Sequence, residues 1–328
     1  GPELQTAFFD IEVDFDKVRG FSPTHDPFNP ITAVSVYLNW LDQLITLAVP
    51  PKSLSMATAK ELVAEFDNTF LFDNEADMLK MFLDLIEDAD VLSGWNSEGY
   101  DIPYTVNRIT RILSKDDTRK FCLWGQFPKP RKFERFGAEQ QTYDLIGRVH
   151  MDYMQLYRKY TYEERHSYSL DAISEHELGE RKTQFEGTLD QLYNQHFKTF
   201  IAYNRQDTAL LDKLDKKLQF LDLANTLAHA NTVLLQTTMG AVAVTDQAII
   251  NEAHERGMVV PNRKQQLTDD NTQAAGAYVA YPKKGMSEWI GSVDINSLYP
   301  SAIRAMNMGP ETVIGQLRPI MTARYIKE

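Results

Sequence analysis

Residues 8–13 read FFDIEV, a run of apolar residues that carries two acidic ones. The apolar residues predict a buried strand, and alternate side chains of a strand point to the same face. Asp10 and Glu12 should therefore project together from one face of a sheet. Strand and helix patterns then alternate along the chain, with strands expected at 32–40, 44–49 and 91–93 and helices at 75–88 and 104–113. This alternation predicts an α/β layer fold.

Two further stretches each contribute a carboxylate. Residues 94–101 read GWNSEGYD, so Asp101 ends a loop-like run just before a predicted helix. Residues 203–207 read YNRQD, and the spacing of four places Tyr203 and Asp207 on one face of a helix. Four carboxylates suit two divalent ions, which are the usual device for cleaving a phosphodiester. Oxygen ligands favour Mg²⁺ or Mn²⁺ over zinc.

Taken singly, each of these signals has an ordinary alternative. The acid pair could lie in solvent at a strand end, and the other two acids could cap a helix or lie on an exposed helix face. The order and spacing of the three stretches favour a metal site, and so does a fourth stretch downstream. That fourth stretch, residues 292–301, reads SVDINSLYPS.

The fourth stretch closely resembles motif A of the family B DNA polymerases, and the three upstream stretches resemble the proofreading exonuclease motifs of that family in the same order. The match is strengthened toward the T-even-like phage branch by residues 101–104 (DIPY), 168–175 (YSLDAISE) and 309–312 (GPET). The resemblance runs from about Phe8 to Glu328. It implies an RNase H-like 3′–5′ exonuclease domain of the DEDD type at 1–222, a helical segment and linker at 223–265, and a partial palm at 266–328.

The resemblance also implies roles at the exonuclease site. Asp10, Glu12 and Asp207 would bind the ion that carries the attacking water, and Tyr203 would orient that water by hydrogen bonding. Asp10 would bridge to a second ion, which Asp101 would hold directly or through water. Water activated in this way needs no protein general base, in keeping with the absence of histidine from these stretches.

Motif A implies a nucleotide pocket whose floor is Ser297, Leu298 and Tyr299, with Tyr299 excluding a ribose by stacking under the sugar. Asp294 would be a metal ligand of the polymerase site. The Tyr-Gly-Asp-Thr-Asp-Ser turn and the lysine-bearing fingers helix of such polymerases are not found in the sequence, so we expect Asp294 to lack its partner carboxylate. We also predict that Asp294 ends a strand at 289–293 and is partly buried, with a raised pKa.

Several residues are candidates for contacts with DNA. Residues 128–142 interleave basic and aromatic side chains around a turn, which is typical either of a solvated charged loop or of a hairpin that contacts DNA. The resemblance favours the hairpin, which in similar polymerases helps to part primer and template. Its contact residues would be Arg131, Lys132, Phe133, Arg135 and Phe136. By resemblance, Lys182 would hold the scissile phosphate, Asn96 would bond the terminal nucleotide, and Gly276 would open a DNA-contacting loop. An exposed loop lysine and an asparagine that caps its own loop are the alternatives.

The leading hypothesis is a metal-dependent proofreading exonuclease part of a family B polymerase, which hydrolyses 3′-terminal nucleotides of single-stranded DNA. Two alternatives stay open: a single-stranded DNA-binding module with little turnover, and the first half of a split polymerase that synthesises DNA only with a second chain. The expected partners are single-stranded 3′ ends and primer–template DNA, with a second polymerase chain and a sliding clamp as further candidates.

Composition limits these hypotheses. The chain has 328 residues, of which 43% are hydrophobic and 24% charged, as in soluble globular proteins with room for two domains. A net charge of −12 requires any DNA contact to be local, because the overall field repels phosphate. A single cysteine, Cys122, excludes a disulfide framework. The lone cysteine also suits a reducing cytosol, and no apolar run approaches the ~20 residues of a membrane span, so we expect a cytoplasmic protein, in the host cell if phage-encoded.

The second half of the exonuclease region reads as helical. The expected helices lie at 169–178, capped by Ser167 or Ser169, at 192–223, and at 225–257 with Gly257 beyond its end. A polar stretch at 261–271 reads as a linker.

Overall fold

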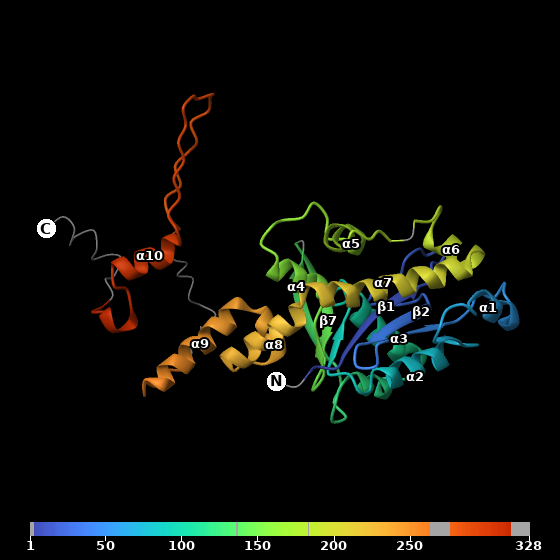
Figure 1. Ribbon diagram of the computed structural model, residues 1–328. Coiled ribbons are helices and arrows are strands. Elements are labelled where there is room, and N and C mark those ends of the chain that lie inside the picture. The colour runs from blue at the N-terminus through green and yellow to red at the C-terminus, as the bar shows by residue number, and fades with distance from the viewer. Residues whose placement is uncertain (1–2, 136, 183, 263–275, 316–328) are drawn as a thin grey trace. The chain divides into compact units, whose positions relative to one another are not determined.

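The computed structural model describes residues 3–135, 137–182, 184–262 and 276–315 (Figure 1). It divides into two compact units, residues 1–262 and residues 263–328. The first unit contains the sheet, the hairpin and most of the helices. The helical segment that follows residue 222 belongs, as far as residue 262, to this same unit.

The main sheet has six strands in the order β4-β3-β2-β1-β5-β8. Strand β1 (Thr6–Val13) lies in its interior, antiparallel to β2 and parallel to β5. The other strands are β2 (Ile31–Leu38), β3 (Gln43–Ala48), β4 (Thr69–Leu71), β5 (Val91–Ser93) and β8 (Val149–His150). The strands predicted at 8–13, 32–40, 44–49 and 91–93 are thus confirmed, within a residue or two at their ends.

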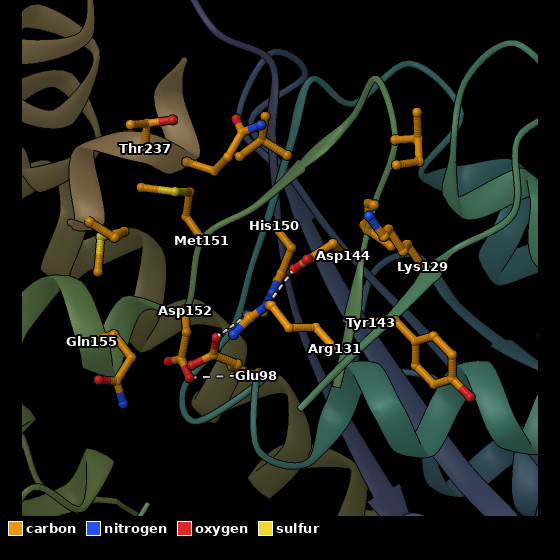
Figure 2. Close-up of a pocket in the computed structure, with 15 residues that line it drawn as sticks. Glu98, Lys129, Arg131, Tyr143, Asp144, His150, Met151, Asp152, Gln155 and Thr237 are labelled. Carbon is orange, nitrogen blue, oxygen red and sulfur yellow. Dashed lines mark hydrogen bonds and ion pairs between the residues drawn. The ribbon is translucent and has the colours of Figure 1, made fainter. Parts of the chain in front are cut away.

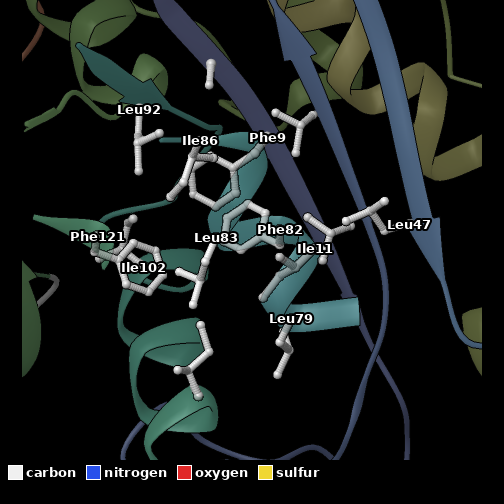
Figure 3. Packing of buried hydrophobic residues seen from close by; sticks show 14 of the residues in the cluster. Phe9, Ile11, Leu47, Leu79, Phe82, Leu83, Ile86, Leu92, Ile102 and Phe121 are labelled. Atoms are coloured by element: carbon white, nitrogen blue, oxygen red, sulfur yellow. The ribbon is translucent and has the colours of Figure 1, made fainter. Parts of the chain in front are cut away.

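Helices pack on both faces of the sheet (Figure 1). The three that matter most for the site are α2 (Glu75–Leu85), α3 (Asp101–Ile112) and α7 (Phe197–Leu218). Phe9 of β1 packs against Phe82 of α2, with ring centroids 5.9 Å apart, in the core drawn in Figure 3. Phe8 points to the opposite face and joins the core of α7. Asp10 and Glu12 alternate with Phe9 in the same way, so they face α7.

The helix starts follow the sequence closely. The Asn74 side chain caps α2 by accepting the backbone N–H of Asp77 at 2.8 Å. Ser169 caps α5 (Leu170–Leu178) in the same way. Helix α3 begins at Asp101, three residues before the predicted start at residue 104, and so places this carboxylate in its first turn.

The prediction of a single helix at 192–223 is wrong. Three helices occupy this stretch and its surroundings: α6 (Leu189–Gln195), α7 (Phe197–Leu218) and α8 (Phe220–Asn231). His196 leaves helical geometry, and Gln219 adopts a left-handed backbone with φ 55°. A residue in either conformation breaks the regular series of helical hydrogen bonds. Thr232, with φ 52°, likewise interrupts the helix predicted at 225–257.

A two-stranded hairpin stands apart from the main sheet, as predicted for residues 128–142. It consists of β6 (Lys129–Arg135) and β7 (Ala138–Asp144), paired in antiparallel register. The remaining helices of the first unit are α1 (Met56–Leu62), η1 (Asp116–Phe121), α4 (Tyr153–Tyr160), η2 (Leu235–Met239) and α9 (Ala241–Glu255).

The described part of the second unit contains α10 (Leu298–Ala305) and η3 (Pro310–Thr312). The strand predicted at 289–293 is wrong: residues 276–296 contain no strand, and Trp289 and Val293 are 99% and 98% exposed. An apolar segment forms a strand only when neighbouring strands pair with it, and no described residue does so here. Asp294 is exposed, so its predicted burial is wrong as well. The linker predicted at 261–271 lies almost wholly outside the described residues.

Candidate active site

Three of the four predicted carboxylates come together between β1 and α7. Asp10 and Glu12 project from β1 toward Asp207, which α7 presents from the facing side. One carboxylate oxygen from each residue lies within 4.8 Å of the other two. Asp10 is partly buried, whereas Glu12 and Asp207 are 9% and 5% exposed. The period of two in β1 therefore places the acid pair as expected.

Burial and mutual repulsion make these carboxylates hold protons strongly. Burial is the main cause that raises the pKa of Glu12 to about 8, and the charge of Asp207 adds to it. Burial followed by the charge of Glu12 raises the pKa of Asp10, and burial raises the pKa of Asp207. Such a group becomes fully ionised at neutral pH when a cation lies among its oxygens.

Asp101 lies beside this group rather than in it. Its Oδ1 accepts the backbone N–H of Ile11, the residue between the two acids of β1, at 3.2 Å. Asp101 is 4% exposed, and burial raises its pKa to about 7. The hydrogen bond ties the start of α3 to the centre of β1.

Lys182 and Tyr203 border the same group. The Lys182 ammonium donates to Asp207 Oδ2 at 2.8 Å and to the Tyr203 hydroxyl at 3.4 Å. Burial opposes the charge of Lys182, but Asp207 outweighs that effect and raises the lysine pKa. Burial raises the pKa of Tyr203 to about 12, so its hydroxyl keeps its proton at neutral pH. Phe185 packs edge-on against the Tyr203 ring, 5.4 Å between centroids.

Asn204 was missed by sequence reasoning. Its fully buried amide donates to Asp10 Oδ2 at 3.0 Å and accepts from the Ser35 hydroxyl at 2.6 Å. The amide therefore holds one oxygen of Asp10 in place. The sequence did contain a sign of this role: Asn204 lies three positions before Asp207, and this spacing puts both side chains on one side of α7.

The donor set fits a divalent metal ion. It consists of carboxylate oxygens, the ligands that Mg²⁺ and Mn²⁺ prefer. Asp207 Oδ1 is buried and has no hydrogen-bond partner among the described residues. A buried carboxylate oxygen without a partner is costly unless a cation or water reaches it. Asp10, Glu12 and Asp207 can therefore hold a metal ion together.

The predicted DNA-contacting residues of the hairpin are engaged within the protein. Arg131 and Arg135 pair with Glu98, and Lys132 pairs with Glu139 at 2.7 Å. Phe133 lies between the two arginines, 5.7 and 5.1 Å from its ring centroid to their guanidinium carbons. Phe136 lies outside the described residues. These contacts leave the DNA-contact prediction untested.

The other predicted contact residues are distributed over both units. The Asn96 side chain accepts from Arg135 at 3.0 Å instead of capping its own loop. Gly276 is exposed in the second unit, as are Leu298 and Tyr299. Ser297 adopts a left-handed backbone with φ 48° directly before α10. The nucleotide pocket of the second unit therefore stays a prediction.

An RNase H-like exonuclease domain is the class that this fold and carboxylate group define. A family model described as the exonuclease domain of DNA polymerase family B matches residues 2–173, and the model of DNA polymerase family B itself matches residues 232–324. The chain belongs to family B of the DNA polymerases. The fold class and family implied by the sequence motifs are confirmed.

Curated relatives agree with this assignment. The DNA-directed DNA polymerase of Enterobacteria phage T4 is 31% identical over 78% of this chain, and that of Escherichia phage RB69 is 27% identical over 99% of it. The DNA polymerase delta catalytic subunit of Bos taurus is 27% identical over 95%. The chain spans 28%, 37% and 28% of the length of these three relatives. Among the described residues, no helix is both long and apolar enough to cross a membrane.

The raised pKa of Glu12 predicts how metal and pH affect stability. In the metal-free protein, Glu12 has a pKa of about 8, against 4.5 as its ordinary value. Glu12 therefore binds its proton more tightly in the folded state than in the unfolded state, and this difference stabilises the fold. The stabilisation is fully present below about pH 4.5 and is lost as the pH rises through about 8. We expect the unfolding free energy in EDTA to fall by roughly 5 kcal/mol over this window, and Mg²⁺ to remove most of the fall.

Thermal or urea unfolding at several pH values, in EDTA and in Mg²⁺, measures this effect. The Glu12→Gln variant is the matched control, because it cannot titrate at this position. Its unfolding free energy in EDTA should fall less steeply with pH than that of the wild type, and the remaining fall comes from Asp10, Asp101 and Asp207. If the unfolding free energy of the wild type falls equally with pH in EDTA and in Mg²⁺, that result would argue against a cation site at these carboxylates.

Proposed function

We propose that this chain is a metal-dependent 3′–5′ exonuclease that removes nucleotides from single-stranded DNA. The observation that carries the proposal is the group formed by Asp10, Glu12 and Asp207, with its unpartnered buried oxygen. The match to the exonuclease domain of family B over residues 2–173 supports it. The DNA substrate comes from the printed activity of the relatives, which are DNA-directed DNA polymerases.

Different side chains of the site would have different roles in phosphodiester cleavage. A pair of Mg²⁺ or Mn²⁺ ions would supply an activated water and stabilise the leaving oxygen. Asp10, Glu12 and Asp207 would hold the first ion, and Asp10 with Asp101 the second. The Tyr203 hydroxyl keeps its proton and can therefore orient the attacking water by donating or accepting a hydrogen bond.

Lys182 would act on the substrate phosphate. Its ammonium already lies 2.8 Å from Asp207 Oδ2, at the edge of the carboxylate group. A fixed cation at this place neutralises charge that develops on the phosphate oxygens, and it does so without moving. The positive charge of Lys182 also lowers the pKa of all three carboxylates, against the effect of their burial.

For the second unit, we propose that Asp294 and residues 297–299 contribute to a site of nucleotide addition. The match of the polymerase family model to residues 232–324 supports this proposal. The exposure of Asp294 agrees with a site that other palm elements would complete. Primer extension by this chain alone would contradict that view.

Digestion of a 5′-labelled single strand tests the proposed exonuclease. With Mg²⁺ and substoichiometric protein, we expect a ladder of labelled products that shorten from the 3′ end, and none in EDTA. A 3′-terminal block on the same oligonucleotide is the matched control and should stop the ladder. Salt-sensitive binding of the strand without products would instead favour a binding module and overturn the proposal.

A further inference from the structure

Glu98 joins the hairpin to the loop that carries Asp101. This residue lies in the loop between β5 and α3, three positions before Asp101. Its Oε1 accepts from Arg131 Nη2 at 2.6 Å, and its Oε2 accepts from Arg135 Nη2 at 2.9 Å. Figure 2 shows Glu98 and Arg131 at the wall of a cavity of about 660 Å³. The Glu98 and Arg135 side chains are only 21% and 14% exposed, so solvent weakens their pairing less than that of a surface ion pair.

The loop is itself held from the side of α4. Asp152, at the start of that helix, accepts the backbone N–H of Asn96 at 3.0 Å and that of Glu98 at 3.2 Å. Arg135 adds a bond from the hairpin to Asn96 Oδ1 at 3.0 Å. A continuous series of hydrogen bonds thus runs from α4 through the loop to the hairpin. The bonds that Arg131 and Arg135 donate are charged, and charged hydrogen bonds are stronger than neutral ones.

The hairpin depends on such contacts for its position. Two strands alone are marginally stable in water, so the body of the domain must hold them. At the base, the Tyr143 hydroxyl donates to Asn107 of α3 at 2.5 Å. Arg131 lies near this base, opposite Thr142, and its Nε also donates to Asp144 at 2.9 Å. Arg135 lies at the turn, opposite Ala138, on the same face of β6, and both arginines reach Glu98. Lys132 lies on the opposite face of β6.

We propose that Glu98 is a positioning residue that docks the turn end of the hairpin on the Asp101 loop, and that it thereby favours cleavage of paired 3′ ends. The proposal rests on the proposed exonuclease function. A paired end must open before a single strand can reach carboxylates that are largely buried. A hairpin docked on the loop that precedes Asp101 is already ordered, and it would occupy the space of the second strand. A loose hairpin must first be ordered, which lowers the rate on paired ends only.

The Glu98→Gln variant tests the proposal, because it keeps the shape of the side chain and removes its charge. We expect amide hydrogen exchange within residues 131–140 to become at least about threefold faster, with α2 and α3 unchanged. We expect the cleavage rate on fully paired 3′ ends to fall about fivefold, and the rate on single strands to stay within about twofold. Glu139→Gln is the matched control, since it breaks the exposed Lys132 pair on the other face of the hairpin, and it should change neither measurement.

A cycle with Arg135→Gln separates docking from direct contact with DNA. If docking is the role, the two single variants and the double variant should lose paired-end cleavage by similar factors. Equal loss on single and paired ends, or unchanged hydrogen exchange in Glu98→Gln, would overturn the proposal. Tighter binding of single strands by Glu98→Gln, together with weaker binding by Arg135→Gln, would also overturn the proposal. That result would mean that the arginines contact DNA directly. Hydrogen exchange reports on docking even when no strand is degraded. A failure of the proposed exonuclease function can therefore be told apart from a failure of the docking role of Glu98.

Discussion

Replacing Asp10 and Glu12 together with alanine is expected to lower metal-dependent degradation of a single strand by at least about a thousandfold, roughly 4 kcal/mol in the activation barrier. The two carboxylates supply most of the oxygens that β1 presents to a metal ion. Asp207 alone, already paired with Lys182 at 2.8 Å, cannot hold that ion in their place. Initial rates on a 5′-labelled strand at saturating Mg²⁺ measure the loss.

The double variant should remain folded. It removes two carboxylates whose proton affinity is raised by burial and mutual repulsion, so its stability in EDTA at neutral pH should equal or exceed that of the wild type. Asp294→Asn is the matched control, because it changes an exposed carboxylate of the second unit and should keep full exonuclease activity. Undiminished cleavage by the double variant would contradict the assignment of the site.

Arg148→Met is expected to destabilise the first unit by about 3 kcal/mol or more. Arg148 is 1% exposed, and its guanidinium donates to four backbone carbonyls and, within the described part of the chain, to no carboxylate. These carbonyls belong to Glu87, Ala89, Lys120 and Phe121, near the ends of α2 and η1. Methionine fills the space of the side chain but leaves the carbonyls without donors in a buried place.

Urea unfolding measures this loss as a lower midpoint. Arg111→Met is the matched control: Arg111 pairs with Asp26 at 2.7 Å, but its side chain is 45% exposed. That variant should change the unfolding free energy by about 0.5 kcal/mol or less. Equal effects of the two substitutions would mean that the buried carbonyls find other donors.

The carboxylate group was predictable because it depends on local periodicity. Alternation in β1 puts Asp10 and Glu12 on one face, and a spacing of four puts Tyr203 and Asp207 on one side of a helix. These rules act within one element, so the sequence alone reveals them. The position of Lys182 followed only from the family resemblance, because no local rule brings a loop lysine to a helix that begins 15 positions later.

The contacts that sequence reasoning missed join elements far apart in the chain. Asn204 reaches Asp10 across 194 positions, and Arg131 reaches Glu98 across 33. Basic residues in a hairpin suggested DNA contacts, but their partner acid lies in another loop and only the fold brings the two together. The helix breaks at His196 and Gln219 have a similar origin, since neither residue is a strong helix breaker by its intrinsic propensity.

The prediction for Asp294 failed for a related reason. An apolar run before the carboxylate predicted a buried strand, yet a strand is stable only within a sheet. Among the described residues of the second unit, none pairs with residues 289–293. Local sequence therefore predicts what a segment can form, while its neighbours decide whether it forms.

The most direct test of the metal centre is a crystal structure of the chain grown with Mn²⁺, with anomalous diffraction used to locate the ions. We expect an ion bound by Asp10, Glu12 and Asp207, with metal–oxygen distances of about 2.0–2.3 Å. Asp10→Ala/Glu12→Ala crystals should lack that ion. Full occupancy elsewhere with none among these three carboxylates, at Mn²⁺ concentrations that support cleavage, would contradict the account.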